Sequence, residues 1–261
     1  MRSGGRLFTW TMRVGVAFVL VARSVAGDWP MWRADAARSA VSPDPLPLDL
    51  HRHWSRSFEP PRPAWPASQP KIRFDESYEP IVADGLVFVG SMVSDRLSAF
   101  DLKTGEERWR FYADGPIRFA PVVWRHRLFF GSDDGFLYAL DARKGQLLWK
   151  QRGGPDGRRV LGNERLISTW PVRGAPVLYE ETDGTATLYY GAGIWPFMGI
   201  FLHAVDPETG RPRWRNSGSG SIFVLQQHSS PAFAGVAPQG YLTVGGNWLL
   251  VSGGADGSGR L

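Results

Sequence analysis

The sequence of 261 residues contains no cysteine. This absence excludes disulfides, thiol nucleophiles, CxxC redox motifs, cysteine-ligated zinc or iron–sulfur clusters, haem attachment through CxxCH and a lipidated N-terminal cysteine. A chain of this length buries enough apolar surface to fold without disulfides. Its lack of cysteine is therefore compatible with export to an oxidising compartment.

Helical periodicity is missing too, because no window keeps an apolar period of 3.6 residues over three turns. Gly (31), Pro (20) and Trp (12) are frequent instead, which favours short strands joined by turns. Neither a G-x-S-x-G nucleophile motif nor a G-x-G-x-x-G nucleotide loop occurs. The sequence thus predicts an all-β protein with no motif for nucleophilic hydrolysis or nucleotide binding.

The first 26 residues have the layout of a secretory signal peptide. A basic segment is followed by the nine-residue apolar run "VGVAFVLVA" and by small residues at Ser24 and Ala26. Nine apolar residues are too few to span a bilayer. We predict a signal peptide at 1–26, a periplasmic or extracellular location, and no transmembrane span after cleavage; an uncleaved anchor is the alternative.

Cleavage would also change the charge of the chain. The formal net charge is +5, and it falls to +1 when the four arginines of the signal segment are removed, namely Arg2, Arg6, Arg13 and Arg23. A nucleic-acid surface needs clustered cations on the folded domain. The sequence therefore predicts no nucleic-acid partner.

A phrase of fixed spacing, Asp-x3-Gly-x3-Trp, occurs three times after an alternating apolar strand. Its copies are Asp101, Gly105 and Trp109; Asp141, Gly145 and Trp149; and Asp206, Gly210 and Trp214. Asp opens a tight turn by accepting backbone N–H groups, and Gly takes the positive-φ position. Trp, on the returning strand, is expected to fill the seam against a neighbouring sheet.

A second phrase precedes each copy: Pro, a short apolar strand, a turn, and an apolar strand that ends at Gly. The pairs are Pro80 with Gly90, Pro121 with Gly131, Pro176 with Gly191 and Pro231 with Gly253. Each unit then has four antiparallel strands within about 40 to 55 residues, which is typical of a β-propeller blade.

The repeat A-x-D-x-x-T-G-x-x-x-W resembles that of the pyrroloquinoline-quinone (PQQ) type propellers, which include quinoprotein dehydrogenases and an outer-membrane assembly lipoprotein. Thr104 and Thr209 match the pattern, whereas Lys144 replaces Thr in the middle unit. The resemblance covers roughly residues 72 to 261. It implies a propeller of four-stranded antiparallel blades, about four of them in this chain.

Two arrangements of the ring follow from the ends of the sequence. The family usually has seven or eight blades, so the chain is expected to be the front part of a longer ring. Alternatively, residues 48–60, with Trp54 in the place of Trp109, form an outer strand that closes a ring of four. We predict an N-terminal lead with this possible ring-closing strand at 27–71 and blades at 72–261, the last one incomplete.

The resemblance also implies a cofactor, which the residues do not support. The dehydrogenases of the family hold PQQ against adjacent cysteines and over a Trp, with calcium bound by Asp, Glu and Asn. This sequence has no cysteine, and its best calcium-like run, "SDDG" at 132–135, equally fits a hairpin turn. We predict no catalytic residue and no metal site; PQQ with calcium remains a possibility by resemblance alone.

Two groups of residues are candidates for ligand binding. Three residues before the first inner-strand proline, successive units carry Ser77, Arg118, Arg173 and His228. These would ring one mouth of the channel and suit a carboxylate or phosphate, or would instead contact loop carbonyls and the nearby acids Asp75, Glu76 and Glu79. Trp170 and Trp195 lie on long loops and would form either an apolar lid over this mouth or a plug.

The function predicted from these observations is a secreted or periplasmic binding or scaffold module, whose partner is another envelope or secreted protein. Two alternatives stay open. One is a PQQ-dependent oxidoreductase or its non-catalytic relative, and the other is a structural envelope propeller without a ligand. Because no catalytic set is present, the sequence favours a protein that is not an enzyme.

Overall fold

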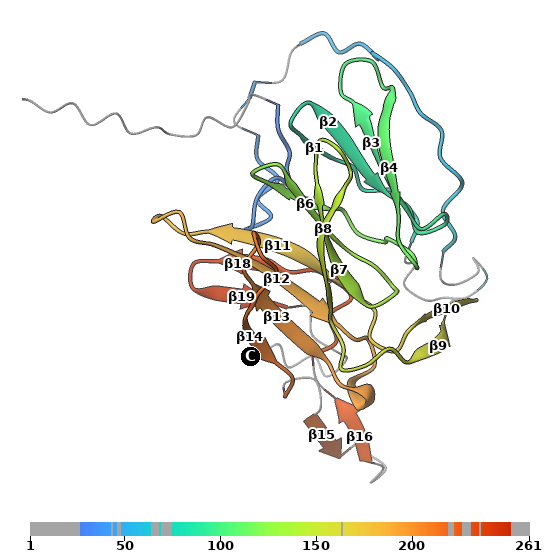
Figure 1. Cartoon of the computed structure of the whole chain (residues 1–261), viewed down its shortest axis with the longest axis vertical. Helices are drawn as coiled ribbons and strands as arrows, with labels where there is room; N and C mark the ends of the chain where they lie inside the picture. Colours follow the sequence, from blue (N-terminus) through green and yellow to red (C-terminus); the bar gives the residue numbers. More distant parts are fainter. Residues whose placement is uncertain are drawn as a thin grey trace, which may run out of the picture.

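We describe a computed structural model of the chain, shown in Figure 1. The structure describes residues 27–251, apart from 43, 46–47, 64–67, 69–74, 163, 219–221, 226–230 and 235. The predicted signal peptide at 1–26 lies outside these residues. The described part is nearly all-β, and its one helical element is a 3-10 turn, η1, at Pro196–Met198. The predicted all-β class is therefore confirmed.

Three antiparallel sheets correspond to three blades. The first contains β1 (Ile81–Ala83), β2 (Leu86–Gly90), β3 (Arg96–Asp101) and β4 (Glu107–Tyr112) in that order. The second contains β5 (Val122–Trp124), β6 (Arg127–Gly131), β7 (Phe136–Asp141) and β8 (Leu147–Arg152). The third contains β11 (Gly174–Glu180), β12 (Ala186–Ala192), β13 (Phe201–Val205) and β14 (Pro212–Asn216), and β17 (Gly240–Tyr241) joins β11 in parallel. The predicted blade of four antiparallel strands is thus confirmed.

Three further hairpins lie outside these blades. β9 (Arg159–Gly162) and β10 (Arg165–Ser168) are inserted between the second and third blades. β15 (Ile222–Leu225) pairs with β16 (Pro231–Ala234), and β18 (Thr243–Gly245) pairs with β19 (Trp248–Leu250). Beside the third blade, β18 and β19 stand where the inner strands of a fourth blade are expected (Figure 1).

The predicted start of the fourth unit at Pro231 was wrong. The strand that begins at Pro231 pairs with β15, and the inner hairpin is instead β18–β19. This hairpin has a two-residue loop, Gly246–Asn247, like the loop Asp84–Gly85 between β1 and β2. Pro231 misled the alignment because a proline at a strand start is common and identifies no particular hairpin.

The three Asp-x3-Gly turns share one geometry. In each, Oδ1 of the aspartate accepts two backbone N–H groups, and the Gly N–H donates to the aspartate carbonyl at 2.8 Å. Gly105, Gly145 and Gly210 have φ near +70° (70°, 68° and 71°). This is the left-handed region, which costs a residue with a Cβ about 1 kcal/mol or more.

The tryptophans of the repeat form the seams between blades. Trp109 and Trp149 each lie opposite an alanine of their own blade, Ala99 and Ala139, which leaves room for the indole. Each ring then covers the turn of the next blade: a Cβ on Gly145 would lie 2.5 Å from Trp109, and one on Gly210 would lie 2.9 Å from Trp149. Trp109 Nε1 also donates to the carbonyl of Ala142 at 3.0 Å.

Trp54 occupies the equivalent place on the first blade. Its Nε1 donates to the carbonyl of Leu102 at 2.9 Å, and a Cβ on Gly105 would lie 2.6 Å from its ring. Residues 51–60 contain no strand, however, and they lie against the first blade rather than against β18–β19. The expected outer strand is therefore an irregular arm, and in the described part of the chain it does not close a ring.

Candidate functional site

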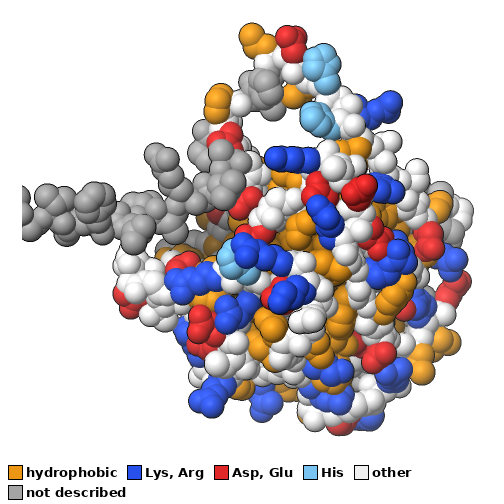
Figure 2. All heavy atoms as spheres, turned by 45° about the horizontal axis from the view of Figure 1, so that its top comes forward, with side chains coloured by type: hydrophobic (Ala, Val, Ile, Leu, Met, Phe, Trp, Pro, Cys, Tyr) orange, Lys and Arg blue, Asp and Glu red, His pale blue; other side chains and the backbone are white. Residues whose placement is uncertain are grey.

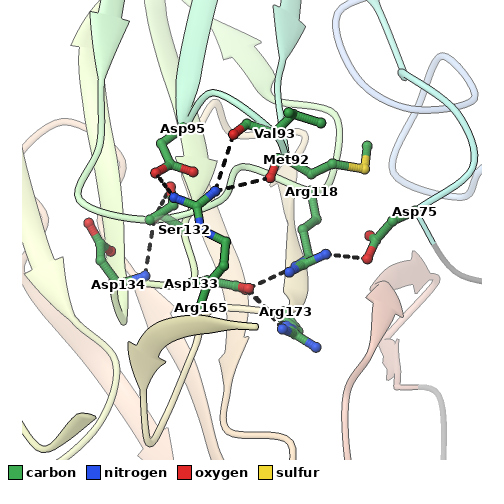
Figure 3. A network of polar contacts seen from close by, with 11 residues as sticks. Asp75, Met92, Val93, Asp95, Arg118, Ser132, Asp133, Asp134, Arg165 and Arg173 are labelled. Carbon is green, nitrogen blue, oxygen red and sulfur yellow. Dashed lines mark hydrogen bonds and ion pairs between the residues drawn. The ribbon is translucent and has the colours of Figure 1, made fainter. Parts of the chain in front are cut away.

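The buried aspartate Asp133 brings two arginines together at one end of the blades (Figure 3). Arg173 makes a bidentate contact with it: Nε donates to Oδ1 at 2.9 Å and Nη2 donates to Oδ2 at 2.8 Å. Arg118 Nε donates to Oδ2 at 2.7 Å, and its Nη1 donates to Asp75. Asp133 is only 1% exposed and both arginines are nearly buried.

The repeat explains why these side chains meet. Arg118 and Arg173 each stand three residues before an inner-strand proline, at matching positions of successive blades. Asp133 lies between these two arginines in the sequence, in the turn that joins β6 to β7. Of the four residues expected at this mouth, the structure thus brings two together.

Of the other two expected residues, only Ser77 is described, and it makes no contact with this network. Ser77 is exposed, and His228 lies outside the described residues. With the corrected register, the residue four positions before β18 is Gln239, which matches Arg118 four positions before β5, and Gln239 is exposed. The charges at this mouth are therefore those of Arg118, Arg173 and the acids that they contact.

Electrostatics holds the network in its charged form. Burial by itself would raise the pKa of Asp133, but Arg173 and Arg118 together bring that pKa below its ordinary value. Burial raises the pKa of Asp75, and Arg118 only partly offsets this effect. Two guanidinium groups face two carboxylates, so the network is close to neutral within itself.

A tyrosine from the C-terminal part of the chain lies beside this network. Tyr241, in β17, donates its hydroxyl hydrogen to Glu79 and accepts the N–H of Ala120 at 2.8 Å. Its ring stacks on Trp32 with centroids 4.0 Å apart. Burial raises the pKa of Glu79 to about 7. Tyr241 thus links the segment before β1, through Glu79, to the segment before β5, through Ala120.

The inserted hairpin β9–β10 is fixed across the same end of the blades. Arg165 donates to Asp95 and to the carbonyl of Val93 (3.2 Å) in the first blade, and Ser168 N donates to the carbonyl of Asp133 at 2.8 Å. Figure 3 shows Arg165 reaching toward Asp95 and Val93 from the side of the hairpin. The insertion therefore ties the second blade to the first.

The two loop tryptophans have different surroundings. Trp170 is 1% exposed, and its Nε1 donates to the carbonyl of Met198 in η1 at 2.8 Å. Trp195 is half-buried near Gly162 of β9. Among the ring contacts of the described residues, none joins Trp170 to Trp195. Trp170 is thus an anchor for η1, and the exposed apolar side chains of this region are Leu161, Leu166 and Phe197.

Sequence reasoning missed Leu161 and Leu166, although both belong to the long connection that it singled out. Their exposed fractions are 78% and 57%, and that of Phe197 is 60%. The available signal was the presence of apolar residues on both strands of a hairpin in which apolar and polar residues alternate. The signal was ambiguous, because the same alternation equally marks the buried face of a strand.

The residues present do not fit a calcium–PQQ site. Within residues 27–251, leaving aside the gaps named above, no group of three or more His, Asp or Glu side chains could hold a metal ion. Asp133 is occupied by the arginines, and Asp134 accepts the N–H of Phe136 at 2.9 Å and the hydroxyl of Tyr138. Arg118 and Arg173 are likewise engaged by acids of the chain itself.

The repeat matches a known family. A PQQ-repeat family model, described as outer membrane protein assembly factor BamB, matches residues 30–216. This chain is a PQQ-repeat β-propeller. The match covers well over half of the chain, and it includes all three copies of the Asp-x3-Gly-x3-Trp phrase.

Curated relatives of this PQQ-repeat propeller include quinone-dependent dehydrogenases and a protein kinase. Quinoprotein ethanol dehydrogenase of Pseudomonas aeruginosa is 30% identical over 165 residues, which is 58% of this chain and 25% of that protein. Serine/threonine-protein kinase AfsK of Streptomyces coelicolor is 46% identical over 221 residues, which is 69% of this chain and 26% of that protein. The chain thus spans about a quarter of the length of these relatives.

Solved structures agree on the fold. Quinohemoprotein alcohol dehydrogenase of Comamonas testosteroni superposes with a TM-score of 0.54 at 24% identity, over 75% of this chain and 28% of that one. A europium-containing methanol dehydrogenase gives a TM-score of 0.53 at 17% identity, over 84% and 40% of the two chains. At this identity the likeness concerns the propeller fold alone.

No helix in the described part of the chain is long or apolar enough to cross a membrane. On the face shown in Figure 2, Lys and Arg side chains are interspersed with Asp and Glu side chains. That face therefore presents no continuous cationic stripe of the kind that binds nucleic acid.

Proposed function

We propose that this PQQ-repeat propeller is a non-catalytic binding or scaffold module that acts in the periplasm or outside the cell on another envelope or secreted protein. The observation that carries the proposal is the engagement of Arg118 and Arg173 by Asp133 and Asp75. Guanidinium groups held in this way are part of the framework. Recognition then falls to the loops that the framework supports.

The proposed binding surface is formed by the inserted hairpin and η1. Leu161, Leu166 and Phe197 are exposed there, while Arg165 and Trp170 fix the two loops to the blades. Exposed apolar side chains on rigid supports lose little conformational freedom when they bind. This is the arrangement expected of a protein-binding surface.

Family membership supports a role in the cell envelope. The matching family model is described as an outer membrane protein assembly factor, which is a binding function, whereas several curated relatives are named as quinone-dependent dehydrogenases. The missing cysteines and the engaged arginines favour the first of these two functions. A signal peptide at 1–26 would deliver the chain to that compartment.

Calorimetric titration with PQQ, with and without calcium, separates the scaffold from the oxidoreductase. We expect no saturable heat of binding from a sample whose folding is verified by circular dichroism. Saturable and calcium-dependent binding would overturn the non-catalytic proposal. A quinoprotein dehydrogenase measured in parallel serves as the positive control.

Site-specific photo-cross-linking tests the proposed surface. A benzophenone amino acid at position 161 or 197, in a host that exports the chain, should yield one discrete cross-linked product. The matched control places the same group at Leu148, which is 48% exposed on β8, away from the insertion. Equal products from all three positions would contradict a binding surface on the insertion.

A further inference from the structure

The inserted hairpin β9–β10 has one edge that is bonded to the blades and one that is not. Ser168 N, in β10, donates to the carbonyl of Asp133 in the second blade at 2.8 Å. No described strand pairs with the other side of β9. The hairpin is held on the first and second blades, which both have all four strands, and it lies away from β18–β19 in Figure 1. β9 is therefore an edge strand.

The register of the hairpin shows which backbone groups of β9 point outward. Antiparallel pairs alternate between pairs that exchange two hydrogen bonds and pairs that exchange none. Ser168 lies opposite Arg159 and donates its N–H to Asp133 instead, so this pair is of the second kind. The pair Leu161–Leu166, two residues further along, is of the second kind as well. The N–H and C=O groups of Arg159 and Leu161 thus point away from β10, and no described backbone group outside the hairpin is bonded to them.

One face of the hairpin carries an exposed apolar pair. Leu161 and Leu166 stand opposite each other on it, and they are 78% and 57% exposed. Because side chains of a pair without hydrogen bonds lie close together, the two leucines form one patch. Arg159 is on the same face as Leu161, since side chains two residues apart on a strand point the same way. A third strand beside β9 would cover part of Leu161 and complete a sheet that is marginal with two strands.

The insertion also concentrates positive charge. Residues 150–168 contain five cations and two acids, a net charge of +3, whereas residues 27–261 together have +1. The cations are Lys150, Arg152, Arg158, Arg159 and Arg165, and the acids are Asp156 and Glu164. Within the described residues, only Arg158 and Arg165 of these cations form ion pairs. Arg159 is exposed and has no such partner. The surface is therefore complementary to an acidic segment.

We propose that an extended acidic segment of the partner protein adds to β9 as a third strand, antiparallel to it. The segment pairs with the outward N–H and C=O groups of Arg159 and Leu161. Its residue opposite Leu161 is apolar and packs on the leucine patch, and its residue opposite Arg159, two positions later, is Asp or Glu. The recognised pattern is thus apolar-x-acidic. This inference rests on the proposed function, because it names the chemistry of the partner at the same surface.

Backbone pairing distinguishes this partner from other anions. A nucleic acid or an acidic glycan brings negative charge to Arg159, but it has no row of N–H and C=O groups at the spacing of a strand. In strand addition the main-chain hydrogen bonds supply affinity and the alternate side chains supply specificity. A test must therefore change the backbone donors of the ligand separately from its charge.

Fluorescence anisotropy with the labelled peptide Ser-Thr-Val-Thr-Glu-Thr-Ser, blocked at both ends, measures this recognition. Two matched peptides carry one N-methyl group, either on Val or on the Thr between Val and Glu. In the antiparallel pairing the N–H of Val points to β9, and the N–H of that Thr points away. We expect methylation of Val to weaken binding about tenfold, through one lost hydrogen bond and the methyl group in its place. Methylation of the Thr should leave binding unchanged.

A charge exchange tests the acidic residue. Arg159→Glu should lose the Glu peptide and gain a peptide with Lys in its place, whereas Arg211→Glu, at an exposed turn of the third blade, should keep the original preference. Three results would overturn the proposal: equal weakening by the two methyl groups, equal binding of the Glu and Lys peptides, or no binding of the Glu peptide by the folded unaltered chain.

Photo-cross-linking separates a failure of this inference from a failure of the proposed function. With the benzophenone group at position 197, Arg159→Glu should abolish the discrete product. A product that persists in Arg159→Glu supports the binding surface and contradicts the acidic strand. Absence of a product from the chain without this substitution contradicts the surface itself, and with it both proposals.

Discussion

At the scale of single residues, Asp133 joins the two arginines of the mouth. Among the described residues it is the one carboxylate to which both Arg118 and Arg173 donate, and it is 1% exposed. Removing one partner of a buried ion pair leaves the other charge without compensation, which costs more than the pair itself contributes. The stability of the network therefore depends on the negative charge of Asp133 more than on its size or its hydrogen-bonding atoms.

Asp133→Asn should lower the free energy of unfolding by about 3 kcal/mol, because two buried guanidinium groups lose their shared counter-charge. Urea unfolding followed by tryptophan fluorescence measures the change. Asp183→Asn is the control, since Asp183 is an exposed turn residue that accepts the N–H of Thr185. A cost at position 133 no greater than that at position 183 would show that the network contributes little.

The raised pKa of Glu79 predicts that the stability of the fold depends on pH. Burial raises its pKa from 4.5 to about 7, so the folded chain binds more protons than the unfolded chain between these values. Its stabilising effect is complete below pH 4.5 and is lost as the pH rises through about 7. Melting temperatures of the unaltered chain and of Glu79→Gln should therefore diverge with rising pH, and the unaltered chain should fall relative to the variant.

The melting temperatures of the two chains must be compared as a difference at each pH, because the effect of His203 on stability changes with pH in the opposite direction. Burial lowers the pKa of His203 to about 4, so its contribution is lost as the pH falls from 6.5 toward that value. Both chains carry His203, and subtraction removes its effect. Parallel melting curves of the two chains across pH 4.5 to 7 would contradict the assignment to Glu79.

At the scale of elements, the outer hairpin is the unit that joins one blade to the next. Its Asp and Gly shape the turn, its Ala opposite the Trp makes room, and the Trp covers the following turn. A tryptophan in the same sequence position is therefore worth more where a following turn is present. Trp149 and Trp214 provide this comparison within one chain.

Trp149→Ala should cost about 3 kcal/mol of unfolding free energy, since it leaves a cavity over Gly210. Trp214→Ala should cost less than Trp149→Ala, because Trp214 is 42% exposed and no turn among the described residues covers it. Guanidinium unfolding at low protein concentration measures both. Equal costs would mean that packing within the blade, rather than the seam, determines the effect.

The repeat also explains which parts of the fold could be predicted from the sequence. The strand-turn-strand pattern repeats three times and is fixed by local chemistry, so the blades and the turns at Gly105, Gly145 and Gly210 follow from it. The fourth unit was placed wrongly because only one of its two phrases is present. In that unit Pro231 was taken as the start of the inner hairpin, whereas the two-residue loop at Gly246–Asn247 marks the hairpin that forms.

The candidate site was less predictable, because its contacts join residues far apart in the sequence. Position in the repeat brought Arg118 and Arg173 to one end, but it gave no sign that Asp133, in a turn of the intervening blade, would lie between them. Arg165 and Tyr241 come from segments outside the repeat. Such segments carry no periodic signal that would place them.

At the scale of the whole molecule, the N-terminal lead connects all three blades along their inner edges. Trp29 pairs with Val82, the carbonyl of Pro30 accepts the N–H of Val123 at 2.8 Å, and Arg38 donates to the carbonyl of Pro176 at 3.2 Å. Arg38 also donates to the carbonyl of Leu242 at 3.0 Å. The lead thus joins the blades to the C-terminal segment at their centre.

Arg38→Ala should therefore lower the melting temperature and expose the segment around Leu242 to protease before the blades unfold. Arg38 is 7% exposed and donates to three backbone carbonyls, each of which would lose a buried donor. Arg33→Ala is the matched control: this arginine also lies near the ring of Trp32, at 5.2 Å, but is exposed. Limited proteolysis with mass mapping measures the order of cleavage. If both variants are cut in the same order and at the same rate as the unaltered chain, the blades hold together without the lead, and the seams alone account for the cooperativity of the fold.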